Sequence, residues 1–337
     1  MKKILPPAYK TFFIICLLLG SLGINPLCQA NLSNEQTSIR FDPPTPPQQP
    51  PTGPGGLNYT HAGIKESRYL WGNYQFWIFE PTDPTPASAP LIVFNHGYNA
   101  IKPYFYQAWI DHLVKRGNIV VFPRYQLGLI AGIPHATQHA ILSTKLAIFI
   151  LTYGNHVRPE LDHFAIVGHS LGGGITAEMA ALAETNHLPT PRAVMPVQPF
   201  INNYTMMENF HNISSDVFLL VVVGEDDTVV GNASGKTIFL TADQIPLENK
   251  DFVIQRTDRY GTPALIADHL APVCIINSTL VNAMDYYSTW KLFDALTDYA
   301  FYGQNQQYCL GNTPEQRFMG NWSDGTAVKE LTVTDTP

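Results

Sequence analysis

The chain has 337 residues, of which 45% are hydrophobic, so it is long and apolar enough for one large globular domain or two small ones. This composition excludes a chain that is disordered throughout, because disorder requires few apolar residues. The formal net charge is −7, and an acidic protein has no electrostatic reason to bind nucleic acid.

Residues 1–30 have the pattern of a secretory signal peptide. Three lysines precede an apolar run at residues 12–24, and small residues stand near residue 30, where cleavage is expected. The run is too short to span a bilayer comfortably, which favours its removal and a secreted or periplasmic protein without stable membrane insertion. A retained membrane anchor is the alternative. Removal would take away three lysines and no acidic residue, which changes the formal net charge to −10.

The next segment, residues 31–56, is predicted to be a disordered Pro-rich tether. Prolines crowd residues 43–54, and prolines at this density extend the backbone and remove hydrogen-bond donors. We therefore expect the folded domain to start near Leu57 and to run to residue 305. Residues 306–337 are expected to be a C-terminal extension.

Early in the domain, residues 74–80 alternate loosely and predict an antiparallel strand. Residues 91–94 form a continuous apolar run, which is typical of a central strand that is covered on both faces. The pattern then predicts a helix over 104–116, a strand over 118–122 and a helix over 136–151.

Further strands are predicted at residues 163–168, 193–197, 217–223 and 252–254, with helices from residue 171 and over 284–302. Strands that alternate with helices indicate an α/β fold with a doubly wound, mostly parallel sheet, whose sites lie at the carboxyl ends of the strands. Only about twenty residues separate the strands that start at 193 and 217. They leave room for one short helix, at 203–210, and for no large cap domain.

The most informative motif is the Gly-x-Ser-x-Gly of residues 168–172. An apolar strand precedes it and a small-residue helix follows it, and this strand–turn–helix setting makes the serine a nucleophile. Only Gly fits the flanking positions 168 and 172 without a Cβ clash. Ser170 is therefore the candidate nucleophile.

A serine nucleophile needs an imidazole base, and that base needs a carboxylate which fixes its orientation. In a sheet of this kind the chain order is nucleophile, acid, histidine. His269 is the histidine that follows the acidic turn at residues 225–227. Asp227 is the preferred acid because it follows an apolar strand that ends at Gly224, and Asp226 is the alternative.

Two backbone N–H groups are expected to stabilise the oxyanion that forms on attack. Leu171, the residue after the nucleophile, supplies one, and Tyr98, just after the strand at 91–94, supplies the other. His96 precedes Ser170 in the chain, so we assign it a structural role. Aromatic residues that are candidates for lining the pocket are Tyr98, Tyr104, Tyr125 and Phe200.

Gly168–Gly173, with His96–Tyr98 upstream and Asp227 and His269 downstream, resembles the α/β-hydrolase superfamily. Within it the chain is most similar to the branch of dienelactone-hydrolase-like proteins, chlorophyllases, platelet-activating-factor acetylhydrolases and cutinase-type polyester hydrolases. The resemblance covers roughly residues 57–305. It implies hydrolysis of a carboxylic ester through an acyl-enzyme, as in esterases and lipases, and an open cleft for bulky esters. The chain departs from dienelactone hydrolases in its nucleophile, which is a Ser here and a Cys in those enzymes.

The sequence therefore predicts a secreted serine hydrolase of carboxylic esters that needs no cofactor. A secreted peptidase or an acyltransferase with the same triad is the alternative. A non-catalytic binding module is disfavoured because no triad member is missing. Two cysteines, Cys274 and Cys309, lie outside the signal and indicate one disulfide, and their spacing lacks the C-x-x-C character of a metal site. The natural substrate and the oligomeric state do not follow from the sequence.

Overall fold

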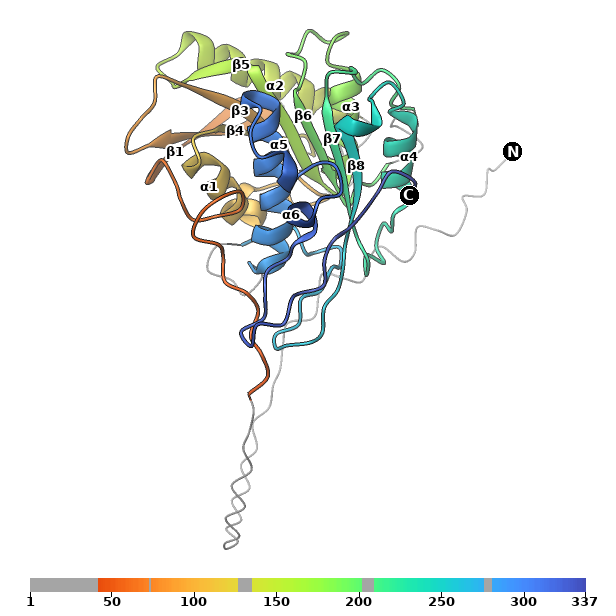
Figure 1. Cartoon of the computed structure of the whole chain (residues 1–337). Helices are drawn as coiled ribbons and strands as arrows, with labels where there is room; N and C mark the ends of the chain where they lie inside the picture. The colour runs from red at the N-terminus through yellow and green to blue at the C-terminus, as the bar shows by residue number, and fades with distance from the viewer. Residues whose placement is uncertain (1–41, 73, 127–134, 202–208, 276–280) are drawn as a thin grey trace, which may run out of the picture. The chain divides into compact units, whose positions relative to one another are not determined.

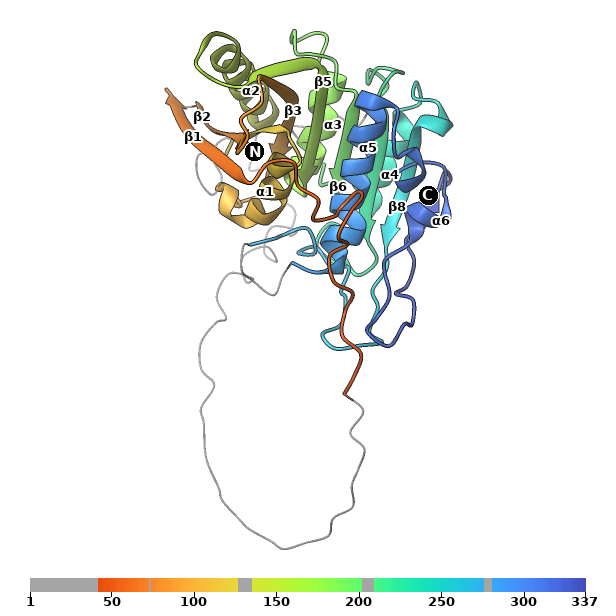
Figure 2. The same cartoon turned by 60° about the vertical axis from the view of Figure 1, so that its left-hand side comes forward.

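One mixed sheet organises the fold, and Figures 1 and 2 show it from two directions. The computed structural model describes residues 42–72, 74–126, 135–201, 209–275 and 281–337. Within these ranges the strand order is β1-β2-β4-β3-β5-β6-β7-β8-β9. The strands are β1 Gly63–Trp71, β2 Tyr74–Thr82, β3 Ser88–Asn95, β4 Ile119–Arg124, β5 Arg158–His169, β6 Ala193–Val197, β7 Phe218–Gly224, β8 Lys250–Gln255 and β9 Thr332–Thr334.

The inner strands of the sheet are parallel and its edges are antiparallel. Strands β4, β3, β5, β6, β7 and β8 pair in parallel in that order. Strands β1 and β2 at one edge and β9 at the other pair antiparallel with their neighbours. The predicted fold class, α/β with a doubly wound and mostly parallel sheet, is confirmed, and so is the early antiparallel strand.

Helices cover both faces of the sheet (Figure 1). Helices α1 Gln107–Lys115 and α5 Trp290–Tyr302 pack on one face, and α2 Ala136–Tyr153, α3 Leu171–Ala181 and α4 Ala233–Thr241 pack on the other. Shorter helical turns are η2 Pro103–Tyr106, η4 Leu247–Asn249, the π-helix η5 Asp285–Thr289, η6 Gln306–Tyr308 and α6 Pro314–Arg317.

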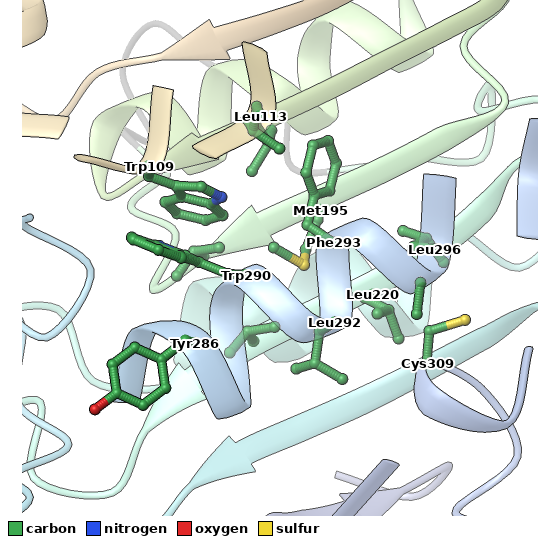
Figure 3. Close-up of a cluster of buried hydrophobic side chains, with 14 of the residues drawn as sticks. Trp109, Leu113, Met195, Leu220, Tyr286, Trp290, Leu292, Phe293, Leu296 and Cys309 are labelled. Carbon is green, nitrogen blue, oxygen red and sulfur yellow. The ribbon is translucent and has the colours of Figure 1, made fainter. Parts of the chain in front are cut away.

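The apolar runs predicted these buried strands because side chains alternate between the two faces. In β3, Ile92 and Phe94 belong to the cluster under α1 and α5, whereas Leu91 and Val93 belong to the cluster under α2 and α3. Figure 3 shows the first cluster, in which α1 and α5 both contribute side chains. A strand that is buried on both sides favours apolar residues at every position, which is why residues 91–94 form a continuous apolar run.

The Pro-rich segment is the first correction to the sequence analysis. Residues 43–56, which we call the strap, are packed on the domain and are not a free tether. The N–H of Thr262 donates to the Pro44 carbonyl at 2.8 Å, and the hydroxyl of Tyr286 donates to the Pro47 carbonyl at 2.6 Å. Proline lacks an N–H but keeps its carbonyl acceptor, so a Pro-rich segment can still be bound by donors from elsewhere in the chain.

The strap ends on a buried carboxylate. The N–H of Gly55 donates to Asp294 Oδ2 on α5 at 2.7 Å. The same oxygen lies 2.8 Å from His112 Nε2 and 3.1 Å from Arg116 Nε. His112 lies in α1, and Arg116 directly follows this helix. Burial opposes the charge on Asp294, but Arg116 and His112 outweigh it and hold the pKa of Asp294 below its usual value. A buried charge with several donors is a strong attachment point.

The C-terminal residues 306–337 also belong to the domain, although the sequence suggested an extension beyond it. Strand β9 adds to the sheet by pairing with β8. Trp322 is buried and its indole N–H donates to Asp258 Oδ2 at 3.1 Å. Thr45 of the strap and Ser323 are joined by two hydrogen bonds, of 2.9 and 3.0 Å. The first and last described segments of the chain are therefore fastened to each other.

The predicted disulfide is wrong in this structure. Cys274 and Cys309 are both free thiols, each buried among apolar side chains, and burial raises the pKa of both. The two cysteines contribute to the core rather than to a covalent link. Within the described ranges no group of three or more His, Cys, Asp or Glu side chains could hold a metal ion.

The signal-peptide prediction for residues 1–30 and the first part of the predicted tether lie outside the described residues. So does nearly all of the short helix that was predicted at 203–210. No helix in the described ranges has the length and apolar character needed to cross a membrane.

Candidate active site

The turn between β5 and α3 holds Ser170 in a strained backbone conformation. Its φ and ψ are 58° and −122°, a region that residues with a Cβ rarely occupy. A Cβ on Gly168 would lie 2.5 Å from the Gly172 carbonyl oxygen, and one on Gly172 would lie 2.3 Å from the Asn95 carbonyl oxygen. Both glycines of the motif are therefore required by close backbone contacts. This is the geometry of a nucleophile elbow.

Three side chains from distant parts of the sequence meet at this turn. Ser170 follows β5, Asp227 follows β7, and His269 lies in the loop after β8. Ser170 Oγ is 2.9 Å from His269 Nε2, and His269 Nδ1 is 2.8 Å from Asp227 Oδ2. The carboxylate can only accept, so Nδ1 carries a proton and Nε2 is left to accept the hydroxyl proton of Ser170.

Asp227 is well suited to remain ionised. Burial opposes its charge, but hydrogen bonds from His269 and from the backbone N–H groups of Val229 and Val230 outweigh this and lower its pKa. These two N–H groups bind Oδ1 at 2.9 and 3.0 Å, which leaves Oδ2 for the imidazole.

The alternative acid, Asp226, is engaged elsewhere. Its Oδ2 accepts from Thr257 Oγ1 at 2.8 Å and from Arg259 Nη2 at 3.1 Å. The structure thus puts Asp227, and not Asp226, against His269.

The two segments predicted to supply oxyanion donors flank Ser170. Leu171 is the first residue of α3, and the first N–H groups of a helix have no partner within the helix and produce a positive potential at its N-terminus. Gly97 packs on the other side, where an added Cβ would lie 3.4 Å from Ser170 Cβ. Tyr98 follows Gly97 directly, and its side chain is 37% exposed. The backbone of Leu171 and that of Gly97 therefore flank the hydroxyl of Ser170.

His96 has the contacts of a structural residue. It is fully buried and donates from Nδ1 to the Gly97 carbonyl at 2.8 Å. Its ring stacks on that of Tyr125 with centroids 4.0 Å apart, and Tyr125 donates in turn to the His96 carbonyl. Burial lowers the pKa of His96 to about 4. Tyr125, which was a candidate for lining the pocket, is therefore part of the core beneath this loop.

The other aromatic candidates are at the surface. Tyr98 and Phe200 are each 37% exposed and Tyr104 is 58% exposed. Next to the triad, Val229 and Leu270 are also exposed. Tyr98, Phe200, Val229 and Leu270 follow directly on residues of the site or are hydrogen-bonded to them, and they give it an apolar surface that suits the hydrocarbon part of an ester.

The loop that carries His269 is held through three successive carbonyl groups, which the sequence analysis missed. The Ala267 carbonyl accepts from the Asp226 N–H at 3.0 Å. The Asp268 carbonyl accepts from Gln198 Nε2 at 2.7 Å, and the carbonyl of His269 itself accepts from His169 Nε2 at 2.9 Å. The donors stand at the ends of β7, β6 and β5. His169 lies inside the Gly-x-Ser-x-Gly motif, but the spacing of the motif residues gives no indication that His169 contacts the His269 loop.

The sheet order, the elbow and the three side chains together define an α/β-hydrolase fold. A family model described as chlorophyllase matches residues 65–211, which is less than half of the chain. Chlorophyllases are ester hydrolases of the α/β-hydrolase type, so over this stretch the chain is similar to an ester-hydrolase family. The match includes Ser170, Leu171 and Tyr98, whereas Asp227 and His269 lie beyond it. A comparison with curated proteins finds no match.

Proposed function

We propose that the protein is a serine hydrolase that cleaves carboxylic esters through an acyl-enzyme intermediate. The observation that carries the proposal is the 2.9 Å contact between Ser170 Oγ and His269 Nε2, with Asp227 bound to the other ring nitrogen at 2.8 Å. The likeness to an ester-hydrolase family over residues 65–211 supports the class of reaction.

In the first half of the reaction, His269 Nε2 takes the proton of Ser170 as Oγ attacks the ester carbonyl carbon. The imidazolium that forms is stabilised by the carboxylate of Asp227. The N–H groups of Leu171 and Tyr98 bind the oxyanion of the tetrahedral intermediate, and each such donor contributes about 10²–10³ in rate. Collapse of the intermediate expels the alcohol, which takes its proton from His269, and leaves the acyl group on Ser170.

In the second half, water replaces the alcohol. His269 takes a proton from the water as its oxygen attacks the acyl carbon, and the same N–H groups bind the second oxyanion. Breakdown of this intermediate releases the carboxylic acid and returns the proton from His269 to Ser170 Oγ. No cofactor enters this sequence of steps.

The test is turnover of p-nitrophenyl esters of graded acyl length by the wild type, by Ser170→Ala and by Ser143→Ala. Ser143 is a buried serine of α2 and serves as the matched control. Ser170→Ala should lower kcat by about 10⁶-fold and leave thermal unfolding nearly unchanged, whereas Ser143→Ala should keep its activity. An active Ser170→Ala variant would disprove the role of Ser170.

Two further measurements separate the alternatives. A fluorophosphonate should label Ser170 in the wild type, and absence of labelling would favour a non-catalytic module. Turnover of matched amides, or transfer of the acyl group to an added alcohol, at rates above that of ester hydrolysis would favour a peptidase or an acyltransferase.

We also propose that the protein is exported, on the basis of the sequence of residues 1–30 alone. N-terminal sequencing of the protein from the growth medium or periplasm should begin near residue 31. Recovery of the intact N-terminus in a membrane fraction would favour a retained anchor.

A further inference from the structure

A continuous set of hydrogen bonds runs behind Ser170 and joins the two loops that flank it. The N–H of Gly97 donates to the hydroxyl of Tyr106 at 3.0 Å. The same hydroxyl lies 2.9 Å from His169 Nδ1, and His169 Nε2 lies 2.9 Å from the His269 carbonyl. Tyr106 and His169 are both buried. One end of this set holds the residue before Tyr98, and the other holds the base itself.

The direction of every proton in the set is fixed. A carbonyl only accepts, so His169 Nε2 must carry a proton and donate it to the His269 carbonyl. Burial lowers the pKa of His169 to about 3, and the neighbouring His269 acts in the same direction. His169 is therefore neutral and its Nδ1 is an acceptor. Tyr106 must then donate to Nδ1, which leaves its oxygen free to accept from Gly97.

The hydrogen bonds of this set join Tyr106 and His169 to each other and to backbone groups, and the His169 ring also packs against the imidazole of His269, with centroids 4.8 Å apart. We propose that His169 and Tyr106 are positioning residues, which hold the His269 loop and the Gly97–Tyr98 loop at a fixed separation across Ser170. This inference rests on the proposed function. It assigns a role to His169, which lies between Gly168 and Ser170, and links that role to Tyr106 on η2.

The other bonds to the His269 loop do not replace this one. Asp226 and Gln198 hold the carbonyls of Ala267 and Asp268, on the chain before the base. The bond from His169 is made to the peptide of His269 itself. It fixes the backbone from which the imidazole projects, and a displacement of about 1 Å in a reacting group can cost about 10²-fold in rate.

The first experiment compares kcat and KM for Tyr106→Phe with those of Tyr286→Phe. Each variant loses one buried hydroxyl, but the hydroxyl of Tyr286 donates to the strap and not to the site. Tyr106→Phe should lower kcat by about 10–10²-fold with KM nearly unchanged, and Tyr286→Phe should retain the wild-type kcat. A wild-type kcat in Tyr106→Phe, or an equal loss of kcat in both variants, would overturn the proposal.

The second experiment uses rescue and additivity. His169→Phe removes both contacts and should lower kcat by about 10²-fold, whereas His169→Gln can donate to the His269 carbonyl and accept from Tyr106, and should recover most of that loss. The double variant Tyr106→Phe/His169→Phe should be no worse than His169→Phe, because residues that act as one unit are not additive. Failure of rescue, or losses that multiply, would show two independent structural effects.

The last measurement does not depend on activity. In the ¹⁵N spectrum of the histidine rings, His169 should carry its proton on Nε2 and should not titrate near neutral pH. A proton on Nδ1, or titration near pH 6.5, would refute the set of hydrogen bonds. If the wild type hydrolyses no ester, the proposed function fails, and this spectrum still decides whether the positioning contacts exist. If the wild type is active and the variants match it, only the positioning role fails.

Discussion

Replacement of Gly55 by alanine tests whether the strap is part of the fold. Gly55 has φ +77°, and a Cβ at this position would lie 2.0 Å from the carbonyl oxygen of Tyr286. Gly53 has φ +84°, but a Cβ there would meet no described atom within 4 Å. The two glycines lie in the same segment and both have a positive φ, which an alanine would adopt only with strain. They differ in whether an added Cβ would meet another part of the chain.

The magnitudes follow from this difference. Both substitutions force an alanine into the left-handed region, which costs about 1–2 kcal/mol. Gly55→Ala must also move the strap off Tyr286, which breaks the 2.7 Å bond from the Gly55 N–H to Asp294. A hydrogen bond to a buried charge is worth about 1.5–3 kcal/mol. Gly55→Ala should therefore cost roughly 3–5 kcal/mol, against about 1–2 kcal/mol for Gly53→Ala.

The assay is urea unfolding of both variants and of the wild type, with thermal melting as a second measure. At about 2–4 °C per kcal/mol, Gly55→Ala should lower Tm by roughly 10 °C, and Gly53→Ala by a few degrees. If residues 43–56 were a free tether, neither variant would differ from the wild type. Equal stabilities for the two variants would refute the packing of the strap described above.

Three more outcomes are expected. Asp227→Asn should lower kcat for ester hydrolysis by about 10⁴-fold and Asp226→Asn by no more than a few-fold; equal losses would contradict the choice of acid. Burial lowers the pKa of His96 from 6.5 to about 4, so the unfolded state binds more protons between these values and stability is lost as the pH falls from 6.5 towards 4. The free energy of unfolding of the wild type and of His96→Phe should be measured in urea at about pH 5 and pH 6. Its slope against pH should be smaller for His96→Phe than for the wild type, and the two slopes should differ by about 1.4 kcal/mol per pH unit. Equal slopes would count against a neutral His96. Cys274 and Cys309 should be inert to a thiol reagent in the native protein and reactive after unfolding without reductant, and no gain in thiols would indicate a disulfide.

The parallel sheet could be predicted because strands that are buried on both faces have continuous apolar sequences. Residues 91–94 and 217–223 are continuous apolar runs, and both lie in central strands. Strand β1 carries exposed residues along one side, and β9 has only three residues, so neither gave a comparable signal. The meeting of Ser170, Asp227 and His269 followed from chain order and from the rule that sites lie at the carboxyl ends of strands.

The errors share one physical cause, which is that composition describes local preference and not long-range contacts. Prolines at residues 43–54 indicate an extended backbone, although residues 51–53 form bends and a turn begins at Pro54. Whether its carbonyls find donors depends on Thr262 and Tyr286, more than two hundred residues away. The same limit applies to Cys274 and Cys309, because their number suggests a link but says nothing of the distance between them. It also applies to His169, whose partners come from η2 and from the loop after β8.

The reciprocal bonds between Thr45 and Ser323 bear on how the protein comes apart. Most domains fray from their ends, where a few residues can detach at little cost. Detachment of either segment would remove these two hydrogen bonds from the other, which would still keep its own bonds to the domain. Each of the two segments should therefore make partial melting of the other more costly.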